Sequence, residues 1–265
     1  DVNDGVDNVY SGFVEGTTLT KEIVEESGYV SWKLPAYSFI QGDSPETVHP
    51  VLWRMEKLNN VSGLFQVLPK VEKGGKDGVI YQVRGYDIAT TSFIKGEDGW
   101  IIIDPMSGAA NAAEAWRVFK ENVDPAAKVS AIIITHSHVD HYNGVVGIVG
   151  LDDIWRVSQE EYMELTKDPV KLREARGEKT LVVAPDGFFD EAISENLYLG
   201  NSMIRRAIYM YGMALPIDQY GHIGSGLGKT ASPASGVLIQ PSFELIPQQD
   251  GLLEMTIDGL SFLFQ

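Results

Sequence analysis

The fold is decided by residues 129–141, which have the sequence VSAIIITHSHVDH. The first six residues form a nearly continuous apolar run, which is typical of a buried strand. Three of the chain's five histidines follow directly, with an aspartate among them. Imidazole nitrogen and carboxylate oxygen are common zinc ligands, so a buried strand that ends in these residues predicts a metal site.

The spacing of the four candidate ligands suggests how they would be arranged. His136 and His138 point the same way if the segment stays extended, because the period of a strand is two, and they can then hold one ion. Asp140 and His141 lie where the chain turns into Tyr142–Val149, for which we expect a short helix, and can face a second ion. Two metal ions about 3.5–4 Å apart can activate one hydroxide. The alternative is a solvated loop of histidines, which the preceding buried strand disfavours.

The segments around this motif predict a layered α/β core. Short β-rich runs occur at Val79–Arg84, Thr90–Lys95 and Trp100–Ile103, and glycines between them indicate turns. Ala109–Val123 then carries apolar residues at helical spacing. A helix between two apolar runs, the second being Val129–Ile134, is typical of helices packed on a sheet.

Composition bounds the possible functions. The 265 residues include 21 basic and 37 acidic side chains, a net charge of −16, so the chain repels phosphate backbones and we expect no nucleic-acid partner. There is no cysteine, which excludes disulfides, thiolate zinc sites and a cysteine nucleophile within this chain. No apolar run approaches the roughly 20 residues that span a bilayer, and the chain begins Asp1-Val2-Asn3 without a signal-peptide pattern.

The metal motif resembles that of the metallo-β-lactamase superfamily, which has an αββα sandwich fold. Flanking segments narrow the resemblance to the zinc-dependent alkylsulfatases, over most of the chain from about Gln41 onward. The segments that carry it are Tyr81–Ala89, Thr91–Ile94, Gly99–Pro105, Thr135–Gly144, Glu195-Asn196, Gly200-Asn201, Arg205–Ala207, Tyr209–Gly212, Gly226–Thr230 and Thr256–Gly259.

This resemblance implies a two-zinc hydrolase that releases sulfate from alkyl sulfate esters such as dodecyl sulfate. His136, His138, Asp140 and His141 are then metal ligands, and Asp140 also positions the metal-bound water. Asp104 either supports the site or is a simple turn residue. Zinc would supply positive charge in an acidic chain and lower the pKa of bound water from 15.7 to about 7.

The family pattern also implies donors that this sequence does not match. Two glutamates, a further histidine and a general acid are expected beyond Gly259, so we expect this chain to be the N-terminal part of a longer protein that supplies the rest of the site, covalently or as a separate chain. The remaining candidate donors are His49, His222, Glu244 and Glu254, and none of them lies in a matching motif. We interpret the two histidines as surface or structural residues.

Two residues are candidates for contact with the substrate. Lys229 follows Gly226-Leu227-Gly228, where a flexible turn could present its ammonium to an anion. Tyr211 lies near the end of a helical segment expected at about Asp190 to Met213, whose other apolar residues favour core packing. The methionines of this segment line either an alkyl pocket or the plain core.

We expect residues 1–68 to be an N-terminal arm packed on the core or on a dimer partner, and residues 69–265 to be a catalytic domain that is incomplete at its C-terminal end. The resemblance also implies a homodimer and, with the absence of cysteine, favours a periplasmic or secreted location. Two alternatives stay open: another hydrolase of the same fold, such as a thioesterase or lactamase, and a catalytically silent interaction fragment.

Overall fold

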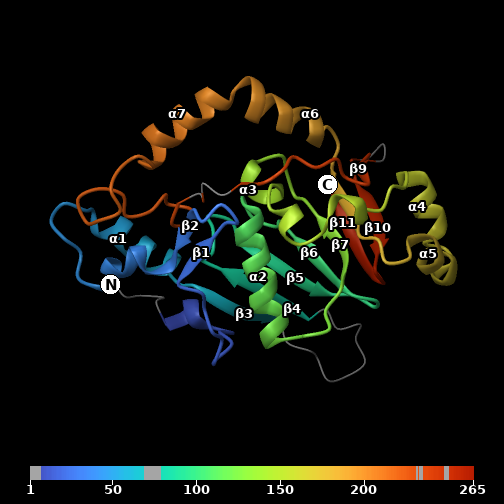
Figure 1. Ribbon diagram of the computed structural model, residues 1–265, viewed down its shortest axis with the longest axis horizontal. Helices are drawn as coiled ribbons and strands as arrows, with labels where there is room; N and C mark the ends of the chain where they lie inside the picture. Colours follow the sequence, from blue (N-terminus) through green and yellow to red (C-terminus); the bar gives the residue numbers. More distant parts are fainter. Residues whose placement is uncertain (1–6, 69–78, 231, 233–234, 248–250) are drawn as a thin grey trace.

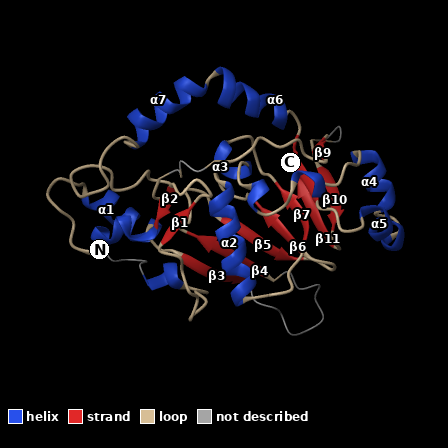
Figure 2. Cartoon of the chain, viewed as in Figure 1, coloured by secondary structure: helices blue, strands red, loops and turns tan. Residues whose placement is uncertain are grey.

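A seven-stranded mixed sheet forms the centre of the molecule (Figures 1 and 2). The structure is a computed structural model that describes residues 7–68, 79–230, 232, 235–247 and 251–265. The strand order is β3-β4-β5-β6-β7-β8-β9. The strands are β3 (Gly63–Leu68), β4 (Ile80–Arg84), β5 (Thr91–Lys95), β6 (Trp100–Ile103), β7 (Val129–Ile133), β8 (Leu181–Pro185) and β9 (Phe243–Leu245).

The sheet changes direction at β6. Strands β3 to β6 pair antiparallel, as expected of segments joined by short turns, whereas β6 to β9 pair parallel. Helix α2 (Ala109–Asn122) makes the crossover between β6 and β7 that parallel pairing requires. The predicted strands and this helix are therefore confirmed, with ends that differ by one residue at most.

Both faces of the sheet are buried, and the side chains alternate between them. Ile102 and Ile132 pack with α2 on one face, while Ile101, Ala131 and Ile133 belong to the apolar cluster of the other face. This is the period of two that makes a parallel strand hydrophobic along its whole length.

Helix α2 is fixed to its face of the sheet mainly by aromatic packing. Phe119 is fully buried and stacks on Phe93 with ring centroids 4.3 Å apart, and Trp100 meets its edge at 4.6 Å. Offset and edge-on aromatic pairs of this kind contribute beyond the area that they bury. The helix thereby holds the crossover that carries the chain to the start of β7.

The opposite face is covered by the hairpin of β10 (Leu253–Ile257) and β11 (Leu260–Phe264), with α4 (Gln159–Leu165) and α5 (Pro169–Arg176) beside it (Figure 1). Asp258 and Gly259 form its turn with φ of 47° and 79°. The Asp258 carboxylate accepts hydrogen bonds from the backbone of Asp98 and Gly99, at 2.9 and 3.0 Å. This hairpin gives a second β layer, so the layered α/β architecture is confirmed.

The N-terminal segment packs on this core. It contains β1 (Glu22–Val24), β2 (Val30–Lys33), a 3-10 segment (Leu34–Gln41) and α1 (Pro50–Asn59). Ile23 and Trp32 join the apolar cluster around α2, and the Trp32 indole donates to Gly85 O at 3.0 Å. The division into residues 1–68 and 69–265 stays a prediction, but β3 at the end of the first range is itself a strand of the central sheet.

The helical segment after β8 differs from expectation. It consists of α6 (Phe188–Ile193), a π-helical turn (Ser194–Tyr198) and α7 (Gly200–Tyr211), which arch over the body of the molecule (Figure 1). Core packing was the wrong prediction for most of its apolar residues, because Leu197, Ile204 and Met210 are 73%, 61% and 63% exposed. Helical spacing creates an apolar face, but it does not specify what covers that face. No helix in the described part of the chain is long and apolar enough to cross a membrane.

Asp87 connects β4 to the loop that follows β6. Its buried carboxylate accepts hydrogen bonds from the backbone of Ile88, Ser107 and Ser232, and from the Ser107 hydroxyl. Burial raises the pKa of Asp87 to about 6, although these hydrogen bonds lower it.

The raised pKa of Asp87 predicts a pH-dependent stability. The folded state holds this proton more tightly than the unfolded state, so the contribution is fully present below pH about 4 and is lost as the pH rises through about 6. Urea titrations should therefore show the native protein gaining stability relative to Asp87→Asn as the pH falls from 6 to 4. A difference that does not change with pH would contradict this.

Candidate metal centre

The histidine motif lies at the carboxyl end of β7, beside the end of β6. Ile134 continues the strand, and His138 is the last extended residue before a short helix, α3 (Val139–Tyr142). The chain then turns at Gly144, where a Cβ atom would lie 2.0 Å from the Pro105 carbonyl oxygen. Only glycine fits there, so this tight turn sets the position of α3 against the loop that follows β6.

The structure brings the four predicted ligands together. The ring centroid of His136 lies 4.7 Å from that of His138 and 4.0 Å from that of His141. Asp140 Oδ2 lies 3.3 Å from His141 Nε2. The predicted short helix over 142–149 is a helical turn at Val139–Tyr142 followed by a 3-10 turn at Val145–Gly147.

Each of the three imidazoles has one nitrogen facing a partner outside the cluster. Thr135 Oγ1 lies 2.9 Å from His136 Nδ1, and Asp104 Oδ2 lies 2.8 Å from His141 Nδ1. Glu195 Oε1 lies 3.7 Å from His138 Nε2, an ion-pair distance. Metal-binding histidines usually have such a partner on the nitrogen that does not bind the metal. The nitrogens left for a cation are therefore Nε2 of the first and third histidines and Nδ1 of the second.

Asp104 supports the site and orders the loop at the same time. Its carboxylate accepts from the backbone N–H and the hydroxyl of Thr135, at 2.9 and 2.7 Å, besides contacting His141. Its own backbone is left-handed, with φ of 54°, and Met106 follows with 62°. Non-glycine residues adopt this conformation uncommonly, although aspartate does so more readily than most, and such backbone is common at functional sites.

The carboxylates around His141 make the histidine cluster a favourable place for positive charge. Burial lowers the pKa of His141, but hydrogen bonds to Asp104 and Asp140 outweigh burial and raise it to about 9. Burial also raises the pKa of Asp140, but its hydrogen bond to His141 prevails and the net shift is downward. The pKa of His136 is lowered by burial and by the neighbouring imidazoles. A proton on His141 thus lies between two carboxylates.

The residue types of the four candidate ligands fit zinc. Their side chains lie close together, but their donor atoms do not all point at one position. Among the described residues, no three His, Asp or Glu side chains are arranged as a formed metal site. The 3.3 Å between Asp140 Oδ2 and His141 Nε2 nevertheless matches two ligands of one tetrahedral zinc, which are about 3.4 Å apart for bonds of about 2.1 Å.

The two predicted substrate contacts differ in their surroundings. Lys229 is 2% exposed, and its ammonium donates to Ser62 Oγ rather than facing solvent from a flexible turn. Burial lowers its pKa to about 8. Tyr211 is the half-buried last residue of α7. Their role in substrate binding stays a prediction.

The other candidate donors have structural contacts. His49 caps α1 through the backbone N–H of Val51, and buried His222 lies 2.9 Å from the Tyr37 hydroxyl. Glu244 accepts from two backbone N–H groups at the start of α6, and Glu254 accepts from the Ser261 hydroxyl.

Glu195 is the residue that sequence reasoning missed. It lies more than 50 positions after the motif and has no metal-ligand spacing to it. The only signal was that Glu195-Asn196 belongs to the segments that resemble alkylsulfatases.

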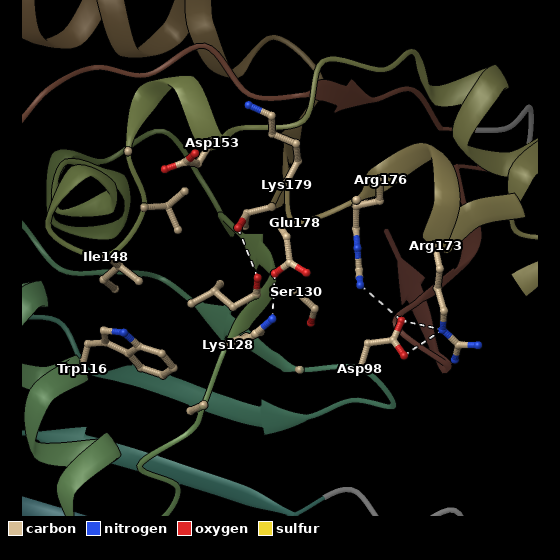
Figure 3. Close-up of a pocket in the computed structure, with 17 residues that line it drawn as sticks. Asp98, Trp116, Lys128, Ser130, Ile148, Asp153, Arg173, Arg176, Glu178 and Lys179 are labelled. Carbon is tan, nitrogen blue, oxygen red and sulfur yellow. Dashed lines mark hydrogen bonds and ion pairs between the residues drawn. The ribbon is translucent and has the colours of Figure 1, made fainter. Parts of the chain in front are cut away.

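A hollow lies at the opposite ends of β7 and β8 from the histidine motif (Figure 3). It has a volume of about 570 Å³ and is lined by charged side chains that are largely paired with one another. Lys128 meets Glu178 at 2.7 Å, and both Arg173 and Arg176 meet Asp98. Because these cations already have partners and the metal motif is at the other end of the strands, we place the functional site at the histidines.

Comparison with known proteins supports this placement. The sequence pattern of the metallo-beta-lactamase superfamily matches residues 84–234, which include all four candidate ligands. A linear primary-alkylsulfatase of Pseudomonas sp. is 36% identical over 97% of this chain and 33% of its own length. An alkyl/aryl-sulfatase of Saccharomyces cerevisiae is 34% identical over 94% of this chain and 34% of its own length.

A solved structure shows the same fold. The stereoselective inverting sec-alkylsulfatase of Pseudomonas sp. superposes with a TM-score of 0.79 at 30% identity, over 99% of this chain and 36% of that protein. The metallo-β-lactamase fold and the resemblance to alkylsulfatases are thus confirmed. The chain spans about a third of the length of the curated relatives it matches.

The contacts of Asp104 predict a specific effect on metal binding. In Asp104→Asn, the amide no longer offers His141 Nδ1 a charged acceptor, and the zinc affinity should fall about 10–100-fold. Competition with a chromophoric chelator measures this, and Asp186→Asn, an exposed aspartate, is the control. Equal affinities of the two variants would refute the supporting role of Asp104.

Proposed function

This chain belongs to the metallo-β-lactamase superfamily, and on that premise we propose that it is part of a zinc-dependent alkylsulfatase, which hydrolyses alkyl sulfate esters to an alcohol and inorganic sulfate. The observation that carries the proposal is the cluster of three imidazoles, each with one nitrogen facing an outside partner and the other left for a cation. The substrate class rests on the named activities of the relatives.

Two zinc ions per complete site are proposed. His136 and His138 would hold one ion, and Asp140 and His141 the other. When bound, the zinc ions supply a hydroxide near neutral pH and positive charge for the sulfate group.

The chain's own residues prepare this chemistry. Asp140 is proposed to orient the attacking water, since its carboxylate faces the cluster beside His141. Asp104 holds the Nδ1 side of His141 and thereby directs Nε2 toward the cation. The chain, with a net charge of −16, offers an anionic ester no general attraction, so binding depends on positive charge concentrated at the site.

Further donors are proposed to come from outside these 265 residues. Catalytic zinc takes three protein ligands and a water, so two ions need more than the four donors of the motif. The other donors considered within the chain have structural partners. Relatives about three times as long contain room for them.

The exposed apolar residues of the helical segment support a homodimer or contact with the rest of the protein. They include Leu197, Ile204 and Ile208, each at least 46% exposed. A patch of this kind typically marks an interaction surface. A thioesterase or lactamase activity and a silent interaction fragment remain the competing functions, and no named relative favours either.

Replacement of one ligand tests the function. In the whole polypeptide as its source organism makes it, His138→Ala should lose zinc and reduce sulfate release from dodecyl sulfate by about 100-fold or more, because the activated water is lost. The matched control is His49→Ala, which removes the cap of α1 and leaves the four donors of the motif in place. Elemental analysis and sulfate release are measured on the same samples. Unchanged release by the ligand variant, or release of thiol or opened β-lactam instead of sulfate, would refute the proposal.

The donor count makes a separate prediction. Residues 1–265 expressed alone should bind zinc more weakly than the whole polypeptide and should release no sulfate, because the ligand set is partial. Calorimetric zinc titration and a sulfate assay on both proteins compare them. Full activity of residues 1–265 would show that donors within this chain complete the site.

A further inference from the structure

Glu195 approaches the metal motif from a different part of the fold. It lies in the π-helical turn between α6 and α7, and its Oε1 is 3.7 Å from His138 Nε2. The Glu195 side chain is 19% exposed, whereas that of His138 is 54% exposed. An approach by a largely covered carboxylate restricts the ring more than a freely solvated partner would.

The turn that carries Glu195 is held against the helix that carries Asp140 and His141. Phe188 of α6 is buried and packs edge-on against Tyr142, with ring centroids 5.1 Å apart. Asn196, the next residue after the glutamate, donates from Nδ2 to the Tyr142 hydroxyl at 3.0 Å and to Ala192 O at 2.9 Å. Single-turn π segments are frequent at functional sites.

The position of the Glu195 carboxylate affects which nitrogen of His138 carries the proton. A neutral ring carries one proton, and a carboxylate beside Nε2 favours the tautomer with the proton on that nitrogen. The Nδ1 lone pair is then available for a cation. Thr135 and Asp104 face Nδ1 of His136 and His141, so those two rings have Nε2 left for a cation, whereas His138 has Nδ1 left.

We propose that Glu195 is a positioning residue that holds His138 in the tautomer and orientation that bind metal through Nδ1, and that it couples docking of the α6–α7 segment to metal affinity. The coupling to metal rests on the proposed function, whereas the tautomer does not. Undocking of the π-helical turn would withdraw the carboxylate and weaken the site without moving β7.

The first test reads the tautomer in the metal-free protein. Ring ¹⁵N shifts of His138, assigned with His138→Ala, are recorded at pH about 8.5, above the ordinary imidazole pKa of about 6.5. We expect the Nε2-H tautomer to predominate in the native protein and its share to fall in Glu195→Gln. The control is Glu191→Gln, which makes the same charge change at an exposed position of α6. A tautomer that is the same in native protein and Glu195→Gln would overturn the proposal.

The second test reads metal affinity in the whole polypeptide. Glu195→Gln should weaken zinc binding about 10–100-fold, Glu195→Asp less, and Glu191→Gln not at all. Circular dichroism checks that each variant is folded, and a misfolded Gln variant leaves the Asp variant to decide. An unchanged zinc affinity with a changed tautomer would overturn the coupling. If even the native protein binds no zinc while the tautomer responds to Glu195, the proposed function fails and the positioning role stands.

Discussion

The carboxylate of Asp104 joins the ends of two parallel strands, and the arrangement of the site depends on it. The backbone N–H of Asp104 extends the hydrogen-bond ladder between β6 and β7 by donating to Ile133 O at 3.1 Å, while the side chain contacts Thr135 and His141. A carboxylate that is only 7% exposed requires such partners, since burial of an unpaired charge is costly. Left-handed backbone at a non-glycine residue costs about 1–3 kcal/mol, and these contacts hold it in place. Asp104 thus fixes the end of β6 against the end of β7, and with them the position of Thr135, which faces His136.

The sequence allowed the core and the gathering of the four candidate ligands to be predicted, because both depend on local pattern. The alternation of Ile101, Ile102 and their neighbours fixes two buried faces within a few residues, and α2 follows from helical spacing. The four candidate ligands lie within six consecutive positions at the end of a strand, so the strand itself brings them together. Asp104 was a weaker prediction, because its partners lie 31 and 37 positions later.

The failures concern residues whose environment is set by distant parts of the chain. The apolar stripe of α7 predicted burial, which is wrong, since the described structure leaves Ile204 and Ile208 exposed. Lys229 looked like a residue in a flexible loop, yet it is enclosed by contacts with Ser62 and Gly85, more than 140 positions earlier. Glu195 reaches His138 from a π-helical turn more than 50 positions later in the chain. The periodicity of apolar residues carries no information about such contacts between residues far apart in the sequence.

The central claim is that these imidazoles bind zinc through the nitrogens that their outside partners leave free. Zinc K-edge absorption spectroscopy of the zinc-loaded whole polypeptide tests it directly. The account predicts nitrogen and oxygen ligands at about 2.0–2.2 Å, with the outer-shell scattering of imidazole rings and no sulfur. A spectrum without imidazole scattering, or one unchanged when His136, His138 and His141 are all replaced, would contradict the account.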